Sequence, residues 1–271
     1  LVTQWFISMF VTLLITLYEV YRAVYKKDDV GTIEASIVWA AVVVIACECV
    51  YAISCYLLLG RPVEGTMNNS TGLALHISLL LPLVIQCSVS AKGAERANVL
   101  SVVVIAIITI FATECRTAIL CAVFIIMVAI EFRFKISIQA KFIAVPTVAI
   151  ILVFFIFSGY KGDSTNGRWF ILKNSIELID GHSATGGFRK VYMEKQAEYF
   201  RQNGEDSYAI LADDIKHPLN EFVYAWINYG IIGGLGLVAL LVFPLVVFFK
   251  KRSFTGICIM VTLVISSMFS Y

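Results

Sequence analysis

The sequence predicts an all-α protein, a polytopic bundle of membrane-spanning helices with one long polar loop. Of the 271 residues, 59% are hydrophobic and only 15% are charged, against about half and about a quarter in an ordinary soluble domain. The apolar residues also gather in runs long enough to cross a hydrocarbon core of about 30 Å. Such runs are expected to be helical, because backbone polar groups in lipid need partners within their own segment.

Eight apolar runs have the length of a membrane span. They lie at residues 1–21, 33–60, 71–90, 97–113, 116–132, 141–160, 220–249 and 254–271. The chain therefore divides into six transmembrane helices (1–160), a periplasmic loop (161–217) and two further transmembrane helices (218–271). Leu1 and Tyr271 each lie inside an apolar run, so we expect a fragment of a longer membrane protein.

The lysines and arginines of the connectors alternate between the two sides of the predicted bundle. The odd-numbered connectors hold eleven cations, namely Arg22, Lys26, Lys27, Lys92, Arg96, Arg133, Lys135, Lys141, Lys250, Lys251 and Arg252. The short even-numbered connectors hold only Arg61 and Arg116. Cytoplasmic connectors carry the excess of cations, so the pattern places loop 161–217 on the periplasmic or extracellular face.

Composition also excludes several classes of protein. A net charge of +2 lacks the basic excess of a nucleic-acid binder. The seven cysteines lie in or beside apolar runs, which argues against a disulfide framework or a zinc site. Loop 161–217 carries eight cations and nine carboxylates, so it is no polybasic lipid anchor. Within this loop, residues 169–179 and 188–200 have the spacing of amphipathic helices, and glycine-rich stretches 162–167 and 181–187 predict turns.

Three positions predicted to face outward could carry chemistry, because polar groups at membrane depth are costly and often functional. Arg116 starts a helix after a tight connection, where it could also be an interfacial arginine that reaches toward water. A glycine turn presents Arg168, which could bind phosphate through paired donors or be a solvated loop arginine. His217 precedes Pro218 at the start of a span, where it could exchange a proton or cap the helix, with Asn220 and Glu221 in the first turn.

Taken together, these motifs resemble the O-antigen ligase and O-antigen polymerase superfamily, which includes protein O-oligosaccharyltransferases. The matching residues are Gly-Thr-Met-Asn-Asn at 65–69, Cys-Arg-Thr-Ala at 115–118, Ser-Thr-Asn-Gly-Arg at 164–168, His-Pro-Leu-Asn-Glu-Phe at 217–222 and Gly-Ile-Ile-Gly at 230–233. Two positions depart from the pattern. Cys115 stands where relatives carry serine, and many relatives have a second histidine within the histidine motif.

The resemblance, which covers residues 61–240, implies a glycosyltransferase of the bacterial inner membrane. Such an enzyme moves a glycan from an undecaprenyl diphosphate carrier to a hydroxyl of a lipid-A core, a glycan or a protein, with inversion and without a cofactor or metal ion. Arg116 and Arg168 would hold the diphosphate, and His217 would stand at the acceptor hydroxyl. The further substrate-binding candidates are Arg189, Lys161, Asn220, Glu221 and Asn68.

Two other classes remain open. Many spans together with Glu48 and His76 inside them would suit a polysaccharide or lipid transporter, although the polar candidates cluster at one face. A membrane protein whose outer loop binds a partner would tolerate the loss of Arg168 or His217. Ligation, polymerisation and transfer to protein also remain alternatives within the enzyme class.

Overall fold

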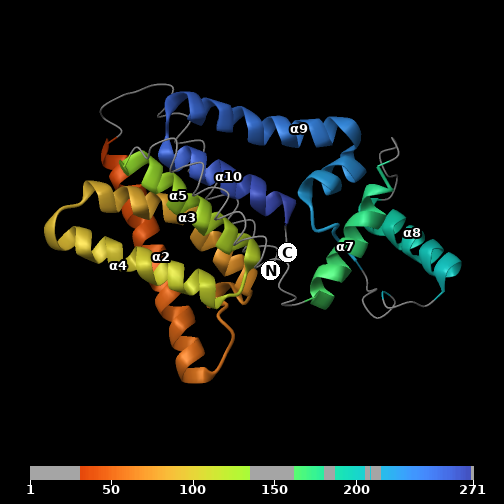
Figure 1. Cartoon of the computed structure of the whole chain (residues 1–271), viewed down its shortest axis with the longest axis horizontal. Coiled ribbons are helices and arrows are strands. Elements are labelled where there is room, and N and C mark those ends of the chain that lie inside the picture. Colours follow the sequence, from red (N-terminus) through yellow and green to blue (C-terminus); the bar gives the residue numbers. More distant parts are fainter. Residues whose placement is uncertain (1–30, 135–161, 180–186, 205–207, 209–214, 270–271) are drawn as a thin grey trace. The chain divides into compact units, whose positions relative to one another are not determined.

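The structure, a computed structural model, describes residues 31–134, 162–179, 187–204, 208 and 215–269. These residues form eight α-helices and one 3₁₀ turn, and they contain no strand (Figure 1). The elements are α2 (Gly31–Leu59), η2 (Gly65–Met67), α3 (Ser70–Ser90), α4 (Gly93–Ala112), α5 (Arg116–Phe134), α7 (Gly162–Ile176), α8 (Gly187–Asn203), α9 (Glu221–Lys251) and α10 (Phe254–Met268).

The all-α membrane architecture is confirmed, with one local error. Helices α2, α3, α4, α5, α9 and α10 correspond to six of the eight predicted spans, while spans 1–21 and 141–160 lie outside the described residues. Four of them, α2 from Ile37, α3, α4 and α9, are long and apolar enough to cross a membrane, and α10 is a shorter apolar helix. The predicted turn at 162–167 is wrong, because these residues are the first turns of α7.

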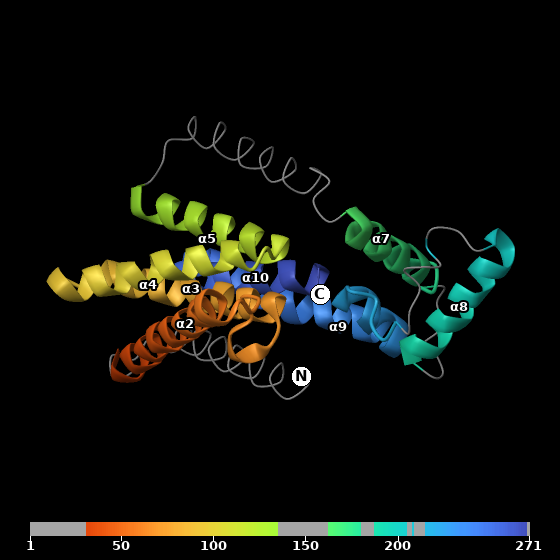
Figure 2. The ribbon, with the colours of Figure 1, turned by 90° about the horizontal axis from the view of Figure 1, so that it is seen from below.

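The chain forms two compact units. Unit 1 contains α2 to α5, α10 and the end of α9 from Pro244. Helix α3 is its centre and packs against α2, α4 and α5, so most of its side chains are buried. The connections between α2 and α3 and between α4 and α5 lie at the same end of this unit (Figure 2).

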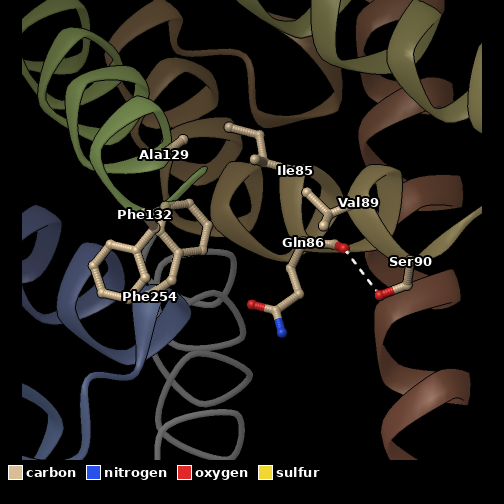
Figure 3. A pocket seen from close by; sticks show the side chains of 7 residues that line it. All are labelled: Ile85, Gln86, Val89, Ser90, Ala129, Phe132 and Phe254. Atoms are coloured by element: carbon tan, nitrogen blue, oxygen red, sulfur yellow. Dashed lines mark hydrogen bonds between the residues drawn. The ribbon is translucent and has the colours of Figure 1, made fainter. Parts of the chain in front are cut away.

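At the opposite end of unit 1, side chains of α3, α5 and α10 surround a cavity of about 250 Å³. Phe132 lies beside Phe254, with ring centroids 5.7 Å apart, and the Thr255 hydroxyl donates to Gln86 Oε1 at 2.8 Å. Figure 3 shows Ser90 reaching the carbonyl of Gln86 at the wall of this cavity. None of the predicted site residues lines it.

Unit 2 contains α7, α8 and α9 up to Phe243. Its core combines Ile171 of α7, Phe188 and Tyr192 of α8, and Ile227 of α9. Phe170 extends the α7–α8 contact, since its ring stacks on Tyr208 at 4.7 Å and meets Tyr199 edge-on at 5.0 Å. Burial of one face of each amphipathic helix therefore holds this unit together.

Gly230 divides α9 into two helical stretches. Its φ of 66° and ψ of −163° are not helical and lie in a region that is essentially open only to glycine. A Cβ at Gly233 would lie 2.3 Å from Tyr229 Cβ, and one at Gly234 would lie 2.6 Å from a Trp226 ring carbon. These glycines thus make room for side chains of the stretch before the bend. The 21 residues at 231–251 still extend about 31 Å, enough to span a membrane.

Candidate functional site

Arg116 is the first residue of α5, as the sequence predicts. Glu114 turns the chain with a φ of 55°, and the Thr113 hydroxyl accepts from the Cys115 amide at 3.4 Å. Cys115 then starts the helical hydrogen bonding by accepting from Ile119 N at 3.0 Å. The Arg116 side chain is partly buried, with its Nη2 atom shielded from solvent. A guanidinium beside free amides at a helix start forms a positive local field that suits an anion.

Asn68 lies in the connection that leads into α3. Its backbone is left-handed, with φ 49° and ψ 33°, and its side chain is exposed. The next residue, Asn69, caps α3 by accepting from Gly72 N at 2.9 Å. A short asparagine tolerates the left-handed region better than most residues, so the sequence and the backbone agree here. Asn68 and Arg116 both belong to unit 1.

Arg168 lies in the second turn of α7, not in a glycine turn. It is exposed, as is its neighbour Trp169, whereas Phe170 and Ile171 point into unit 2. Ser175, one turn after Ile171, is also buried, and its hydroxyl donates to Ile171 O within the helix at 2.7 Å. Helix packing thus directs the Arg168 guanidinium to the outside of the unit, where it is accessible to a ligand.

His217 is held by three neighbours. Its Nδ1 accepts from Leu219 N at 3.1 Å, and its Nε2 lies 3.4 Å from Glu221 Oε2. Its ring also packs on Tyr224, with centroids 4.5 Å apart. Leu219 has a φ of 59°, an uncommon backbone state for a leucine. Because Nδ1 accepts a hydrogen bond from the Leu219 amide, the neutral imidazole carries its own proton on Nε2, toward Glu221.

Asn220, rather than His217, is the cap of α9, so that part of the prediction is wrong. The Asn220 Oδ1 accepts from Phe222 N at 3.0 Å and from Val223 N at 3.1 Å. Its Nδ2 donates to Met268 O at 3.2 Å, within the same unit. Asparagine satisfies free helix amides with a short side-chain oxygen, which a histidine does less well. Glu221 is then the first helical residue, and its carboxylate is partly exposed.

Unit 2 brings Phe188, the chain neighbour of Arg189, and His217 into one packing cluster. Phe188, next to Arg189, packs on Tyr224 with ring centroids 6.2 Å apart, and Tyr224 packs on His217. The Phe188 amide also donates to Asn228 Oδ1 at 3.0 Å. Arg189 itself is exposed in the first turn of α8. Lys161, the remaining candidate, lies outside the described residues.

Sequence reasoning missed Tyr224 and Asn228, which hold these candidates in place. Both lie on the face of α9 that also carries Glu221, at spacings of three and four residues. That helical spacing was the available signal. It predicts a shared face but not the partners, since Phe188 lies 36 residues before Tyr224.

Tyr192 is the buried polar residue closest to this cluster, and its ring stacks on Phe188 with centroids 5.2 Å apart. Burial raises the pKa of Tyr192 to about 12, and the nearby Asn174 side chain offsets part of this rise. Among the described residues, its hydroxyl forms no hydrogen bond of regular geometry, although Asn174 lies near enough to affect its pKa. Tyr192 therefore stays protonated at physiological pH and contributes packing to the cluster.

Comparison with known protein families shows to which family this chain belongs. A family model described as O-antigen ligase matches residues 101–238, which is 138 of the 271 residues. The chain belongs to the O-antigen ligase family. No curated protein and no solved structure matches it.

Membership of the O-antigen ligase family, together with four apolar helices of spanning length, makes this protein a multi-pass membrane protein of a glycosyltransferase family. The matched region contains Arg116, Arg168, Arg189 and His217, while Asn68 precedes it. In the described part of the chain, no group of three or more His, Cys, Asp or Glu residues could hold a metal ion. Independence from a metal stays a prediction.

Proposed function

We propose that this protein transfers a glycan from an undecaprenyl diphosphate carrier to a hydroxyl acceptor at the outer face of the bacterial inner membrane. The observation that carries the proposal is the O-antigen ligase match at 101–238, because it spans Arg116, Arg168 and His217. The distribution of connector cations supports the outer face. The acceptor is a lipid-A core, a growing glycan or a protein.

Arg116 and Arg168 hold the carrier diphosphate in this proposal. As the acceptor oxygen bonds to the anomeric carbon, the bond from that carbon to the carrier phosphate oxygen breaks, and the configuration inverts. The leaving diphosphate gains negative charge, which paired guanidinium donors stabilise more in a partly dry site than in water. The chemistry needs no metal ion when two arginines supply the positive charge.

The acceptor proton goes to the pair formed by His217 and Glu221. The Leu219 amide occupies His217 Nδ1, and the proton on Nε2 points toward the Glu221 carboxylate. His217 therefore orients the Glu221 carboxylate through its Nε2 proton, and Glu221 is the group that takes the proton of the acceptor hydroxyl. General-base catalysis of this kind contributes about 10²–10⁴-fold to a rate.

The test measures glycan transfer in a bacterial strain that lacks its own enzyme and expresses this protein or its variants. Arg116→Ala, Arg168→Ala and His217→Ala should each reach the membrane, lose about 10²-fold or more of transfer and let carrier-linked glycan accumulate. The control is Arg201→Ala, an exposed arginine in the last turn of α8 that is not a site candidate. Transfer that survives all three site changes would refute the proposal.

A second pair of variants separates the roles within the proton pair. Glu221→Gln keeps the size of the side chain but removes the basic carboxylate, so transfer should fall about as far as for His217→Ala. Glu221→Asp should retain part of the activity because it keeps the carboxylate. If the Glu221→Gln protein keeps full activity, His217 and not Glu221 is the base.

A further inference from the structure

Glu48 lies midway along the apolar part of α2, is half-buried and contacts the connection that carries Asn68. It belongs to the candidate span that runs from Ile37 to Leu59 in α2, eleven residues before the end of the helix. An ionisable side chain within an apolar helix is uncommon and is often functional. Both carboxylate oxygens of Glu48 are occupied by one residue, Thr66. Oε2 accepts from the Thr66 amide at 3.0 Å, and Oε1 accepts from the Thr66 hydroxyl.

Gly65 allows this close approach. A Cβ at Gly65 would lie 2.6 Å from Glu48 Oε2 and 2.8 Å from Leu73 Cδ1. Its φ of +59° is also a conformation that glycine adopts at little cost. The 3₁₀ turn η2 therefore lies against the side of α2 at Glu48, with the first turn of α3 beside it. This contact joins α2 to η2, since Glu48 and Thr66 are 18 residues apart in the sequence.

The contact fixes the backbone on one side of Asn68. On the other side, Asn69 is fixed as the cap of α3 through its bond from Gly72 N. Asn68 stands between these two anchors in a left-handed conformation, and its exposed amide carries both donors and an acceptor. An amide held in this way can bind a sugar hydroxyl or a phosphate oxygen without first losing much conformational freedom.

We propose that Glu48 is a positioning residue that fixes residues 65–69 and thereby presents Asn68 to the carrier-linked glycan donor. The proposal rests on the proposed function, because the donor is the ligand that Asn68 binds. Glu48 acts through Thr66, from which both of its oxygens accept. The inference predicts that loss of the contact weakens donor binding and leaves the chemical step largely intact.

The experiment uses the protein in vesicles with undecaprenyl diphosphate-linked glycan as donor, and it measures KM for the donor and kcat separately. Glu48→Ala and Thr66→Val should each raise KM about tenfold, as expected when a hydrogen bond to a charged group is lost. The value of kcat should change less than about threefold. Asn68→Ala should raise KM by a similar factor, and combining it with Thr66→Val should add little, because both changes remove the same interaction.

Two conservative variants separate positioning from charge. Thr66→Ser keeps the hydroxyl that Val lacks, so its KM should stay close to that of the unchanged protein. Glu48→Gln can still accept from the Thr66 amide and donate to the Thr66 oxygen, so it should recover most of the KM lost in Glu48→Ala. If Glu48→Gln is as poor as Glu48→Ala, the negative charge itself is required and the positioning role is refuted.

The remaining outcomes are also decisive. Thr66→Val tests the contact even if Glu48→Ala fails to accumulate, because it keeps the carboxylate and the Thr66 amide. An unchanged KM in Thr66→Val, or a collapse of kcat with KM constant, refutes the inference. Arg116→Ala, Arg168→Ala and His217→Ala in the same assay test the proposed function: if all three transfer normally, that function fails. If they are inactive while the Thr66 variants match the unchanged protein, only the role of Glu48 fails.

Discussion

The two units hold their polar candidate residues by different means. In unit 1, hydrogen bonds fix the backbone of the connection between α2 and α3. Thr66 donates to Glu48, and Asn69 accepts from Gly72 N. In unit 2, ring packing adds to the polar contacts of the side chain, since His217 packs on Tyr224 and Tyr224 packs on Phe188. Apolar packing supplies little driving force between helices in lipid, so polar bonds matter more in unit 1. The watery surroundings proposed for α7 and α8 favour aromatic burial in unit 2.

The largest expected effect is at Phe188, the centre of the aromatic cluster. Phe188→Ala should destabilise unit 2 by about 3–5 kcal/mol, because it removes a fully buried ring that contacts both Tyr192 and Tyr224. Protease cleavage between α7 and α8 in sealed membranes measures the loss. The matched control is Phe249→Ala in unit 1, a ring that is 56% exposed. Equal protection of both variants would show that ring packing does not hold unit 2.

A second prediction concerns the bend that joins the short first stretch of α9 to its span. Gly230→Ala forces a Cβ into a φ of 66° and ψ of −163°, at a cost of about 1–3 kcal/mol. Relief of this strain should displace Glu221 and lower transfer about tenfold, with membrane accumulation measured in parallel. Gly236→Ala is the control, because a Cβ there meets no atom within 4 Å. If both variants transfer normally, the bend is dispensable.

The sequence predicts the positions of the described apolar helices well and their ends less well. Six apolar runs become helices whose ends lie within four residues of the prediction, because run length and hydrocarbon thickness alone decide them. A turn is predicted at 162–167 because Gly162, Asn166 and Gly167 favour turns locally. The segment is helical instead, because burial of Phe170 and Ile171 stabilises α7. Tertiary packing here overrides local propensity.

In the candidate site too, local features could be predicted from the sequence and contacts between distant segments could not. Arg116 is found at a helix start, since Thr113 and Glu114 mark a tight connection in the sequence itself. The pairing of Glu48 with Thr66 could not be predicted, because no periodic pattern relates residues that are 18 positions apart across a connection. The cap at Asn220 was misplaced by three residues, since His217, Pro218 and Asn220 all suit a helix start.

A third prediction compares the two arginines. Arg116 is partly buried at a helix start, whereas Arg168 is exposed on α7. Lysine cannot copy the paired donors of arginine, and a buried position gives its ammonium less room to adjust. Arg116→Lys should therefore lower transfer about tenfold, and Arg168→Lys only about threefold, when both are measured at equal membrane abundance. The reverse order would mean that Arg168 makes the more constrained contact with the diphosphate.

The smallest effect is expected at Tyr192, whose buried hydroxyl contrasts with that of Ser78 in unit 1. The Ser78 hydroxyl donates to Ala74 O at 2.8 Å, whereas that of Tyr192 forms no hydrogen bond of regular geometry in the described part of the chain. Tyr192→Phe should therefore be neutral or should stabilise unit 2 by up to about 1 kcal/mol.

Tyr192 also makes unit 2 sensitive to high pH. Its folded pKa of about 12 lies above the ordinary value of 10, so its neutral form stabilises the fold fully below pH 10, and this stability is lost as the pH rises toward 12. Tyr192→Phe should remove that part of the loss. Thermal unfolding of the protein in detergent, followed between pH 9 and pH 12 by protease sensitivity of the loop between α7 and α8, measures it. Identical alkaline profiles for both proteins would show that the Tyr192 hydroxyl reaches water or a partner, because only a solvated or paired phenol ionises without cost to the fold.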